Sequence, residues 1–135
     1  DYKALYDSVD SYIADFEKAQ EAVRAATGVE VKLFRFPGGS INAYNKKVYQ
    51  QIAGEMTNRG YIYYDWNASL EDAVSNPKAE TLIQNAVNST LDRKKIILLA
   101  HDVVGETGRC LEELLDQFPE YEMELLTEET EPIQF

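Results

Sequence analysis

Apolar residues recur at three- and four-residue spacing in the N-terminal part of the chain. Between Ser8 and Thr27 one stripe is formed by Val9, Tyr12, Ile13, Phe16, Ala19 and Val23. This spacing predicts an amphipathic helix. Gly28 follows it directly and suits the left-handed conformation in which many helices end.

Three later segments also have helical spacing. They are residues 45–58 with Val48, Ile52 and Met56 on one face, a segment after Asn76 and Pro77 with Leu82, Ile83, Ala86 and Val87, and Thr107 to Phe118 with Leu111, Leu114, Leu115 and Phe118. Asn76 and Pro77 predict an N-cap followed by a first-turn proline. Each segment therefore predicts a helix with one buried face.

Four short runs are typical of strands. They are Val31 to Phe36, Tyr61 to Asp65, Ile96 to Ala100, and the region around Met123 to Leu126. The alternation of strands with helices predicts an α/β fold in which parallel strands are joined by right-handed crossovers, in an open sheet or as part of a barrel. A first helix with no strand before it indicates a chain that begins partway through such a fold.

Composition narrows the classes of partner. The 135 residues include 24 acidic and 13 basic side chains, which gives a net charge of -11. A field of this sign repels phosphate backbones and anionic lipids, so we expect neither nucleic acid nor a membrane as a partner. No apolar run reaches the roughly 20 residues of a membrane-spanning helix. Cys110 is the only cysteine, so an internal disulfide and a cysteine-based metal cluster are excluded.

The ends of three predicted strands have reactive side chains. The first ends in Arg35-Phe36-Pro37-Gly38-Gly39, the second in Asp65-Trp66-Asn67, and the third in Leu99-Ala100-His101-Asp102. In parallel α/β folds functional residues gather at these ends. Each position also has a structural interpretation, since arginine can tie down a loop and Asp or Asn can cap a helix. Turn chemistry requires neither arginine nor histidine, so the combination favours a site.

These motifs resemble those of the polysaccharide deacetylases, the NodB-homology domains of carbohydrate esterase family 4. The run Phe34 to Gly39 is similar to the third motif of the family, Leu99 to Asp102 to the fifth, and Tyr61 to Ala73 to the fourth. In the fourth motif Ala73 stands where alignment on Asp72 would place tryptophan. The resemblance implies a NodB-type (β/α) barrel, of which residues 1–135 would be the C-terminal part of the deacetylase domain.

The resemblance also implies roles for individual residues. His101 would be the general acid that protonates the departing amine, because imidazole exchanges protons near neutral pH. Asp65 or Asp72 would hold the ring of His101, and Arg35 would orient an aspartate base through a forked pair of hydrogen bonds.

Three further positions would contact the substrate. The backbone N–H of Gly38 matches the position in the family that helps to bind the oxyanion, where tyrosine is common. Leu99 and Trp66 would line the acetyl pocket, although both could also be packing residues.

The family's first two motifs, which supply an aspartate pair and two ligand histidines, have no counterpart here, since His101 is the only histidine. Asp1-Tyr2-Lys3 resembles the sequence just after the second ligand histidine. We expect a domain truncated at its N-terminus that binds no divalent, zinc-type metal tightly and is inactive in isolation, although its parent family hydrolyses carbon–nitrogen bonds. Exposed edges predict a homo-oligomer, and the family implies an acetylated polysaccharide substrate and an extracellular or cell-wall location.

The alternative is a complete, non-catalytic α/β module that binds a ligand or a protein and shares only loop residues with the deacetylases. It would have four parallel strands in one compact sheet. A phosphoacceptor role for Asp65 is not supported, because the acidic pair and the strand-end lysine typical of receiver domains are not evident.

Overall fold

The computed structural model describes residues 1–135, which form two compact units. Unit 1 comprises Asp1–Asp65 together with Leu126–Phe135, and unit 2 comprises Trp66–Leu125. No helix in either unit is both long enough and apolar enough to cross a membrane.

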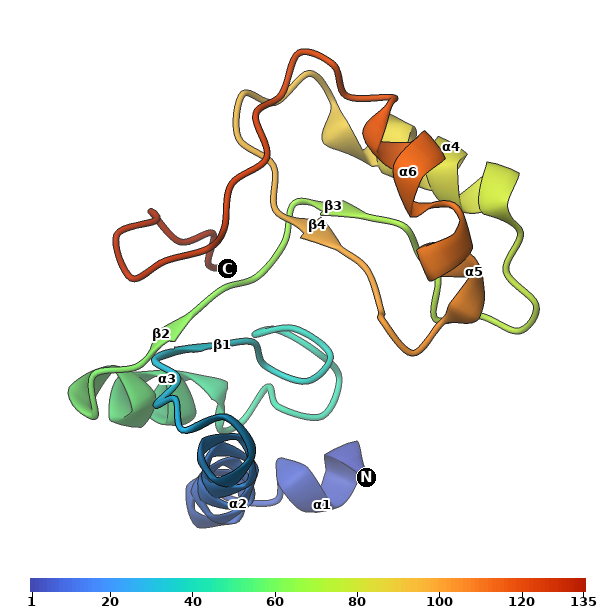
Figure 1. Ribbon diagram of the computed structural model, residues 1–135. Coiled ribbons are helices and arrows are strands. Elements are labelled where there is room, and N and C mark those ends of the chain that lie inside the picture. Colours follow the sequence, from blue (N-terminus) through green and yellow to red (C-terminus); the bar gives the residue numbers. More distant parts are fainter. The chain divides into compact units, whose positions relative to one another are not determined.

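Unit 1 contains three helices and two strands (Figure 1). In chain order they are α1 (Tyr2–Leu5), α2 (Val9–Thr27), β1 (Leu33–Phe34), α3 (Tyr49–Asn58) and β2 (Ile62–Tyr63). The two strands pair in parallel, with Leu33 opposite Ile62 and Phe34 opposite Tyr63. This confirms a parallel pair in which α3 is the crossover helix.

Local chemistry explains the bounds of α2. The hydroxyl of Ser8 accepts a hydrogen bond from the N–H of Ser11 at 3.0 Å, which satisfies one of the free donors at the helix start. Gly28 ends the helix with φ of 74°, a left-handed conformation that costs glycine little. The predicted helix is confirmed, and its buried side chains are Tyr12 and Ile13.

The core of unit 1 is largely aromatic. Phe36, which follows β1, is fully buried and packs against Tyr12 and Tyr63 with ring centroids 5.4 and 5.1 Å apart. Ile52 and Met56 from α3 are also fully buried in the same cluster. The loop after β1 is therefore anchored by its second residue.

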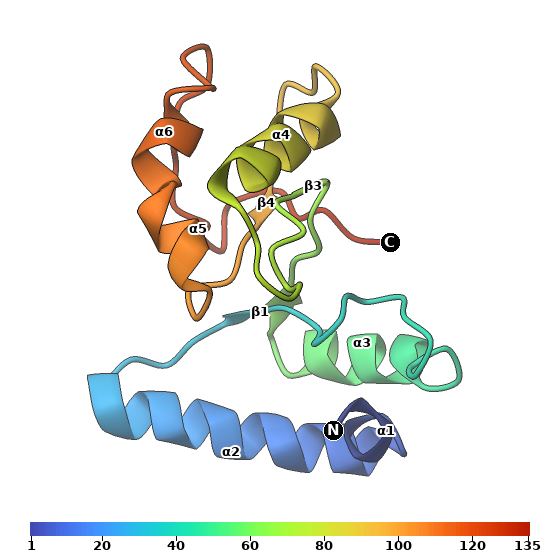
Figure 2. The ribbon, with the colours of Figure 1, turned by 90° about the vertical axis from the view of Figure 1, so that its right-hand side faces the viewer.

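Unit 2 contains two strands and three helices (Figure 2). They are β3 (Ala68–Ser69), α4 (Ala79–Thr90), β4 (Leu98–Leu99), α5 (Gly105–Arg109) and α6 (Leu111–Leu115). The strands are parallel, and α4 lies beside both α5 and α6. The buried core consists of Leu70, Leu82, Ile83, Ala86, Cys110, Leu114 and Phe118. The four strands thus form two separate two-stranded sheets and not the single sheet of the non-catalytic alternative.

The prediction of one helix from Thr107 to Phe118 was wrong. Helical structure begins at Gly105 and is divided at Cys110, whose φ and ψ are -93° and 3°. Two glycines, at 105 and 108, weaken the helical preference of this segment. Of the expected stripe, Leu114 and Phe118 are buried, whereas Leu111 and Leu115 are exposed.

The predicted start of α4 at Asn76 and Pro77 was also wrong. Lys78 is the N-cap and has an extended conformation, so Pro77 lies outside the helix. Proline keeps the residue before it out of the right-handed helical region. Asn76 instead adopts a φ of 53°, a left-handed conformation that asparagine tolerates better than most residues.

The region around Met123 to Leu126 is irregular and not a strand. Met123 and Leu125 are exposed, so the apolar composition of this run does not reflect burial. The residues that follow it attach to the end of β2 in unit 1: the N–H of Asp65 donates to the carbonyl of Ile133 at 2.7 Å. The short β3 and α1 were not predicted from the sequence.

Candidate functional site

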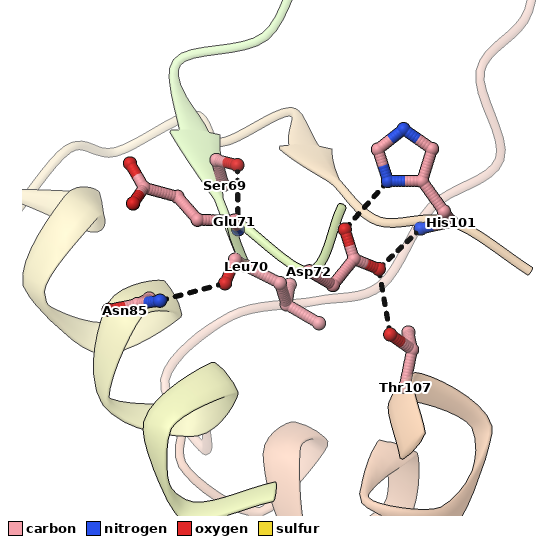
Figure 3. A network of polar contacts seen from close by, with 7 residues as sticks. All are labelled: Ser69, Leu70, Glu71, Asp72, Asn85, His101 and Thr107. Carbon is pink, nitrogen blue, oxygen red and sulfur yellow. Dashed lines mark hydrogen bonds and ion pairs between the residues drawn. The ribbon is translucent and has the colours of Figure 1, made fainter. Parts of the chain in front are cut away.

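A carboxylate and the imidazole lie in contact in unit 2 (Figure 3). Nδ1 of His101 is 2.6 Å from Oδ1 of Asp72. The backbone N–H of His101 donates to the other carboxylate oxygen, Oδ2, at 2.8 Å. Asp72 is 1% exposed, whereas the side chain of His101 is 30% exposed. The pair therefore consists of a buried anion and an imidazole that solvent or a substrate can reach.

The parallel pairing of β3 and β4 brings these two residues together. Ser69 lies opposite Leu99, and the N–H of Leu70 donates to the carbonyl of Leu99 at 3.1 Å. Asp72 comes three residues after the end of β3, and His101 two residues after the end of β4. Because both follow the carboxyl ends of neighbouring parallel strands, they meet at the same edge.

The turn that presents Asp72 is held on both sides. The side chain of Leu70 is fully buried, and its carbonyl accepts from Nδ2 of Asn85 at 2.9 Å. Glu71 adopts a φ of 52°, and its N–H donates to the hydroxyl of Ser69 at 3.0 Å. This left-handed residue lets the chain change direction between Leu70 and Asp72.

Two opposing effects act on the carboxyl of Asp72. Burial alone would raise its pKa, but the hydrogen bonds from His101 and Thr107 outweigh burial and hold the pKa of Asp72 below its usual value. Asp72 is thus an anion at neutral pH, and an anion can only accept at the 2.6 Å contact. The proton of this hydrogen bond is therefore assigned to Nδ1 of His101, and Nε2 points away from the carboxylate (Figure 3).

Asp65 has a different set of partners in unit 1. Its Oδ1 accepts from the N–H of Ser40 at 2.9 Å, and its Oδ2 accepts from the hydroxyl of Ser40. The N–H of Phe135 donates to the same Oδ2 at 3.3 Å. This buried carboxylate joins the end of β2, the loop after β1 and the C-terminal residue.

The Pro-Gly-Gly loop after β1 requires its glycines. Gly38 and Gly39 have φ values of 80° and 88°, which side chains other than glycine rarely adopt. The carbonyl of Pro37 accepts from the hydroxyl of Tyr6 at 2.7 Å. Burial raises the pKa of Tyr6 to about 12, so this donor keeps its proton across the physiological range. Arg35, at the start of the loop, is exposed.

The seven residues singled out from the sequence are divided between the units. Arg35, Gly38 and Asp65 belong to unit 1. Trp66, Leu99, Asp72 and His101 belong to unit 2, where Trp66 and Leu99 are half-buried. The structure brings Asp72 and His101 into direct contact.

Sequence reasoning missed two hydroxyl side chains. Thr107 donates from Oγ1 to Oδ2 of Asp72 at 2.7 Å, and Ser40 binds Asp65. Thr107 lies 35 residues from Asp72 in the sequence. No spacing pattern marks such a partner, because the contact depends on how α5 packs against the turn after β3.

No group of three or more His, Cys, Asp or Glu side chains is arranged to hold a metal ion. Asp72 already uses both oxygens to accept hydrogen bonds within unit 2. The residues of this chain therefore do not fit the three-ligand set of a catalytic zinc-type site.

A family model described as polysaccharide deacetylase matches residues 4–57. Among solved structures, the catalytic domain of peptidoglycan N-acetylglucosamine deacetylase from Eubacterium rectale is 27% identical with a TM-score of 0.92, over 100% of this chain and 64% of that one. No curated protein has a significant match.

Two more distant structures share the fold. A polysaccharide deacetylase from Bacillus cereus is 21% identical with a TM-score of 0.83, over 100% of this chain and 66% of that one. A carbohydrate esterase family 4 enzyme from Streptococcus mutans is 16% identical with a TM-score of 0.73, over 89% of this chain and 56% of that one. The chain thus has the fold of NodB-type deacetylase domains and spans less than two thirds of the length of each.

Proposed function

We propose that this chain belongs to the polysaccharide deacetylase family, whose model matches residues 4–57, and that it takes part in removing N-acetyl or O-acetyl groups from a carbohydrate polymer. Peptidoglycan is the first candidate, since the similar protein from Eubacterium rectale is a peptidoglycan N-acetylglucosamine deacetylase. A chitin-like glycan is the second. A substrate in the cell wall would require the protein to be extracellular or associated with the wall.

The contact between Asp72 and His101 is the observation on which this proposal rests. Hydrolysis of an acetamido group breaks the bond between the carbonyl carbon and nitrogen, and the departing nitrogen needs a proton. A protonated imidazole held at Nδ1 by a carboxylate directs its second proton, on Nε2, away from that carboxylate. We infer that His101 supplies this proton and that the anion of Asp72, in contact with Nδ1, stabilises the charged ring until transfer.

Asp72, and not Asp65, is the carboxylate that we assign to His101. Both oxygens of Asp65 accept hydrogen bonds from Ser40, and Phe135 adds another. Through these contacts Asp65 holds the loop after β1 in place. The backbone N–H of Gly38 lies in that loop, so Asp65 would act on the reaction only by keeping the loop in place.

The other assignments follow the family resemblance. Arg35 would orient the base, the N–H of Gly38 would bind the oxyanion, and Leu99 and Trp66 would line the acetyl pocket. Two of these residues, Arg35 and Gly38, are exposed, and the other two, Leu99 and Trp66, are half-buried. Each therefore has surface with which a substrate could make contact. A divalent metal is typical of the family, but the residues present here provide no ligand set for it, so no step is assigned to a metal.

Acetate release from an acetylated amino-sugar oligomer tests the proposal. In the protein that contains this chain, His101→Gln should lower kcat by a factor of about 10² to 10⁴, the usual contribution of a general acid. Asp102→Asn is the matched control, because Asp102 is the exposed neighbour of His101 and should leave kcat unchanged. Full activity in His101→Gln would rule out the assigned acid.

The 135 residues by themselves offer a second check. Since they provide no group of ligands for a metal, we expect them to release no acetate above the uncatalysed rate. Turnover typical of an enzyme by these residues alone would show that the reaction needs nothing outside them.

A further inference from the structure

The Asp72 carboxylate has a third partner, from α5. Thr107 is 6% exposed, and its hydroxyl donates to Oδ2 of Asp72 at 2.7 Å. The same oxygen accepts from the backbone N–H of His101, while Oδ1 faces the imidazole (Figure 3). The carboxylate therefore has two donors on one oxygen and the ring on the other.

The two donors at Oδ2 are not equivalent. One belongs to the backbone of His101, so it moves together with the imidazole. The hydroxyl of Thr107 belongs to a different element and ties the carboxylate to α5. The terminal torsion of an aspartate has a broad energy minimum. A second, independent donor at Oδ2 restricts rotation of the Asp72 carboxylate about its Cβ–Cγ bond. Oδ1 is thereby kept in the direction of Nδ1 of His101.

The direction of the Thr107 hydroxyl is itself informative. Threonine hydroxyls in helices commonly donate to a carbonyl one turn earlier in the same helix. Thr90 in α4 does so, donating to the carbonyl of Val87 at 2.8 Å. Thr107 instead donates out of its own helix to a buried anion. A hydrogen bond to a charged acceptor is the stronger kind, which fits a role in fixing the acceptor.

We propose that Thr107 is a positioning residue, whose hydroxyl fixes the carboxylate of Asp72 and thereby the tautomer and orientation of the His101 imidazole. The effect on the ring stands on the geometry of unit 2 alone. Its consequence for turnover rests on the proposed function, in which His101 donates a proton.

Nuclear magnetic resonance of the imidazole in the intact protein is the direct test. The signal is assigned by its loss in His101→Gln. In the wild type, Nδ1 should carry a proton with a far-downfield resonance and slow exchange with water. In Thr107→Val, which replaces the hydroxyl by a methyl group, this resonance should move upfield and exchange about tenfold faster, and the second tautomer should be populated.

Three further variants separate positioning from packing. Thr107→Ser keeps the hydroxyl and should give the wild-type spectrum. Thr107→Ala lacks the hydroxyl and should give the spectrum of Thr107→Val. Thr90→Val removes another buried hydroxyl of the same unit and should leave the His101 signal unchanged. Should Thr107→Val fail to fold, the comparison of the serine and alanine variants decides the question.

Turnover adds a second readout. Thr107→Val should lower kcat about tenfold at unchanged KM, because the buried hydroxyl of Thr107 contacts Asp72 and its loss would misalign only the acid. An imidazole spectrum that is the same in all Thr107 variants would overturn the positioning role. If the spectrum changes as expected but His101→Gln retains full activity, the proposed function fails while the positioning role of Thr107 stands.

Discussion

Replacing Asp72 by asparagine measures what the buried carboxylate contributes to stability. Its two oxygens accept three hydrogen bonds, two from His101 and one from Thr107. Hydrogen bonds to an ionised acceptor contribute about 1.5–3 kcal/mol each, against about 1 kcal/mol between neutral groups. The amide of Asp72→Asn can keep its oxygen toward the two donors at Oδ2 and turn its NH₂ toward the ring. We therefore expect a loss of about 2 kcal/mol in the free energy of unfolding at neutral pH.

The same variant should change the response to acid. The pKa of Asp72 in the folded protein lies below the usual 3.8. A carboxyl whose pKa is depressed by folding stabilises the fold fully above its unfolded pKa, and this stabilisation disappears as the pH falls through the folded pKa. The contribution of the ionised Asp72 to the difference in unfolding free energy between the wild type and Asp72→Asn should therefore shrink as the pH falls below about 4.

Urea denaturation followed by circular dichroism at a series of pH values gives both quantities. Asp102→Asn removes a neighbouring exposed carboxylate and should cost less than about 0.5 kcal/mol. An equally small cost for Asp72→Asn would refute the assigned hydrogen bonds. A difference that persists undiminished at the lowest pH at which the protein folds would contradict the direction of the pKa shift.

Two further variants test the elements that support these sites. Leu70→Ala should lower the free energy of unfolding by about 2–5 kcal/mol, because Leu70 is fully buried beside the turn to Asp72; a cost below about 1 kcal/mol would contradict this packing. Gly38→Ala should cost about 1–2 kcal/mol from its φ of 80°, plus strain from a methyl group 3.2 Å from the ring of Tyr2. Gly28→Ala has a similar φ and no atom within 4 Å, so in thermal melts it should lose less stability than Gly38→Ala.

The sequence was sufficient to predict α2 because two independent signals agreed there. The apolar stripe from Val9 to Val23 marks the helix, and Gly28 marks its end. The segment from 107 to 118 had a similar stripe, but its glycines and the break at Cys110 divided it into two short helices. The spacing of apolar residues alone therefore did not determine the length of a helix in a segment whose glycines disfavour helical backbone.

The choice between Asp65 and Asp72 could not be made from the sequence. Asp65 ends the predicted strand 61–65, so a strand-end rule favours it. The strand that leads to Asp72 is only two residues long, Ala68–Ser69, and no hydrophobic alternation of that length can be recognised. In the structure, the carboxylate of Asp65 accepts hydrogen bonds from Ser40 and Phe135, which lie 25 and 70 residues away along the chain.

The position of Asp72 relative to the β3–β4 pair explains why the carboxylate and the imidazole are in contact. The last backbone hydrogen bond of this strand pair is donated by the N–H of Leu70 to the carbonyl of Leu99. In a longer parallel pair the N–H of His101 would donate to the next backbone carbonyl of the neighbouring strand. Here the left-handed Glu71 turns the chain away, and the carboxylate of Asp72 accepts that N–H instead. One side chain thus ends the sheet and binds both the backbone and the ring of His101, so the end of the strand pair itself sets the direction of the imidazole.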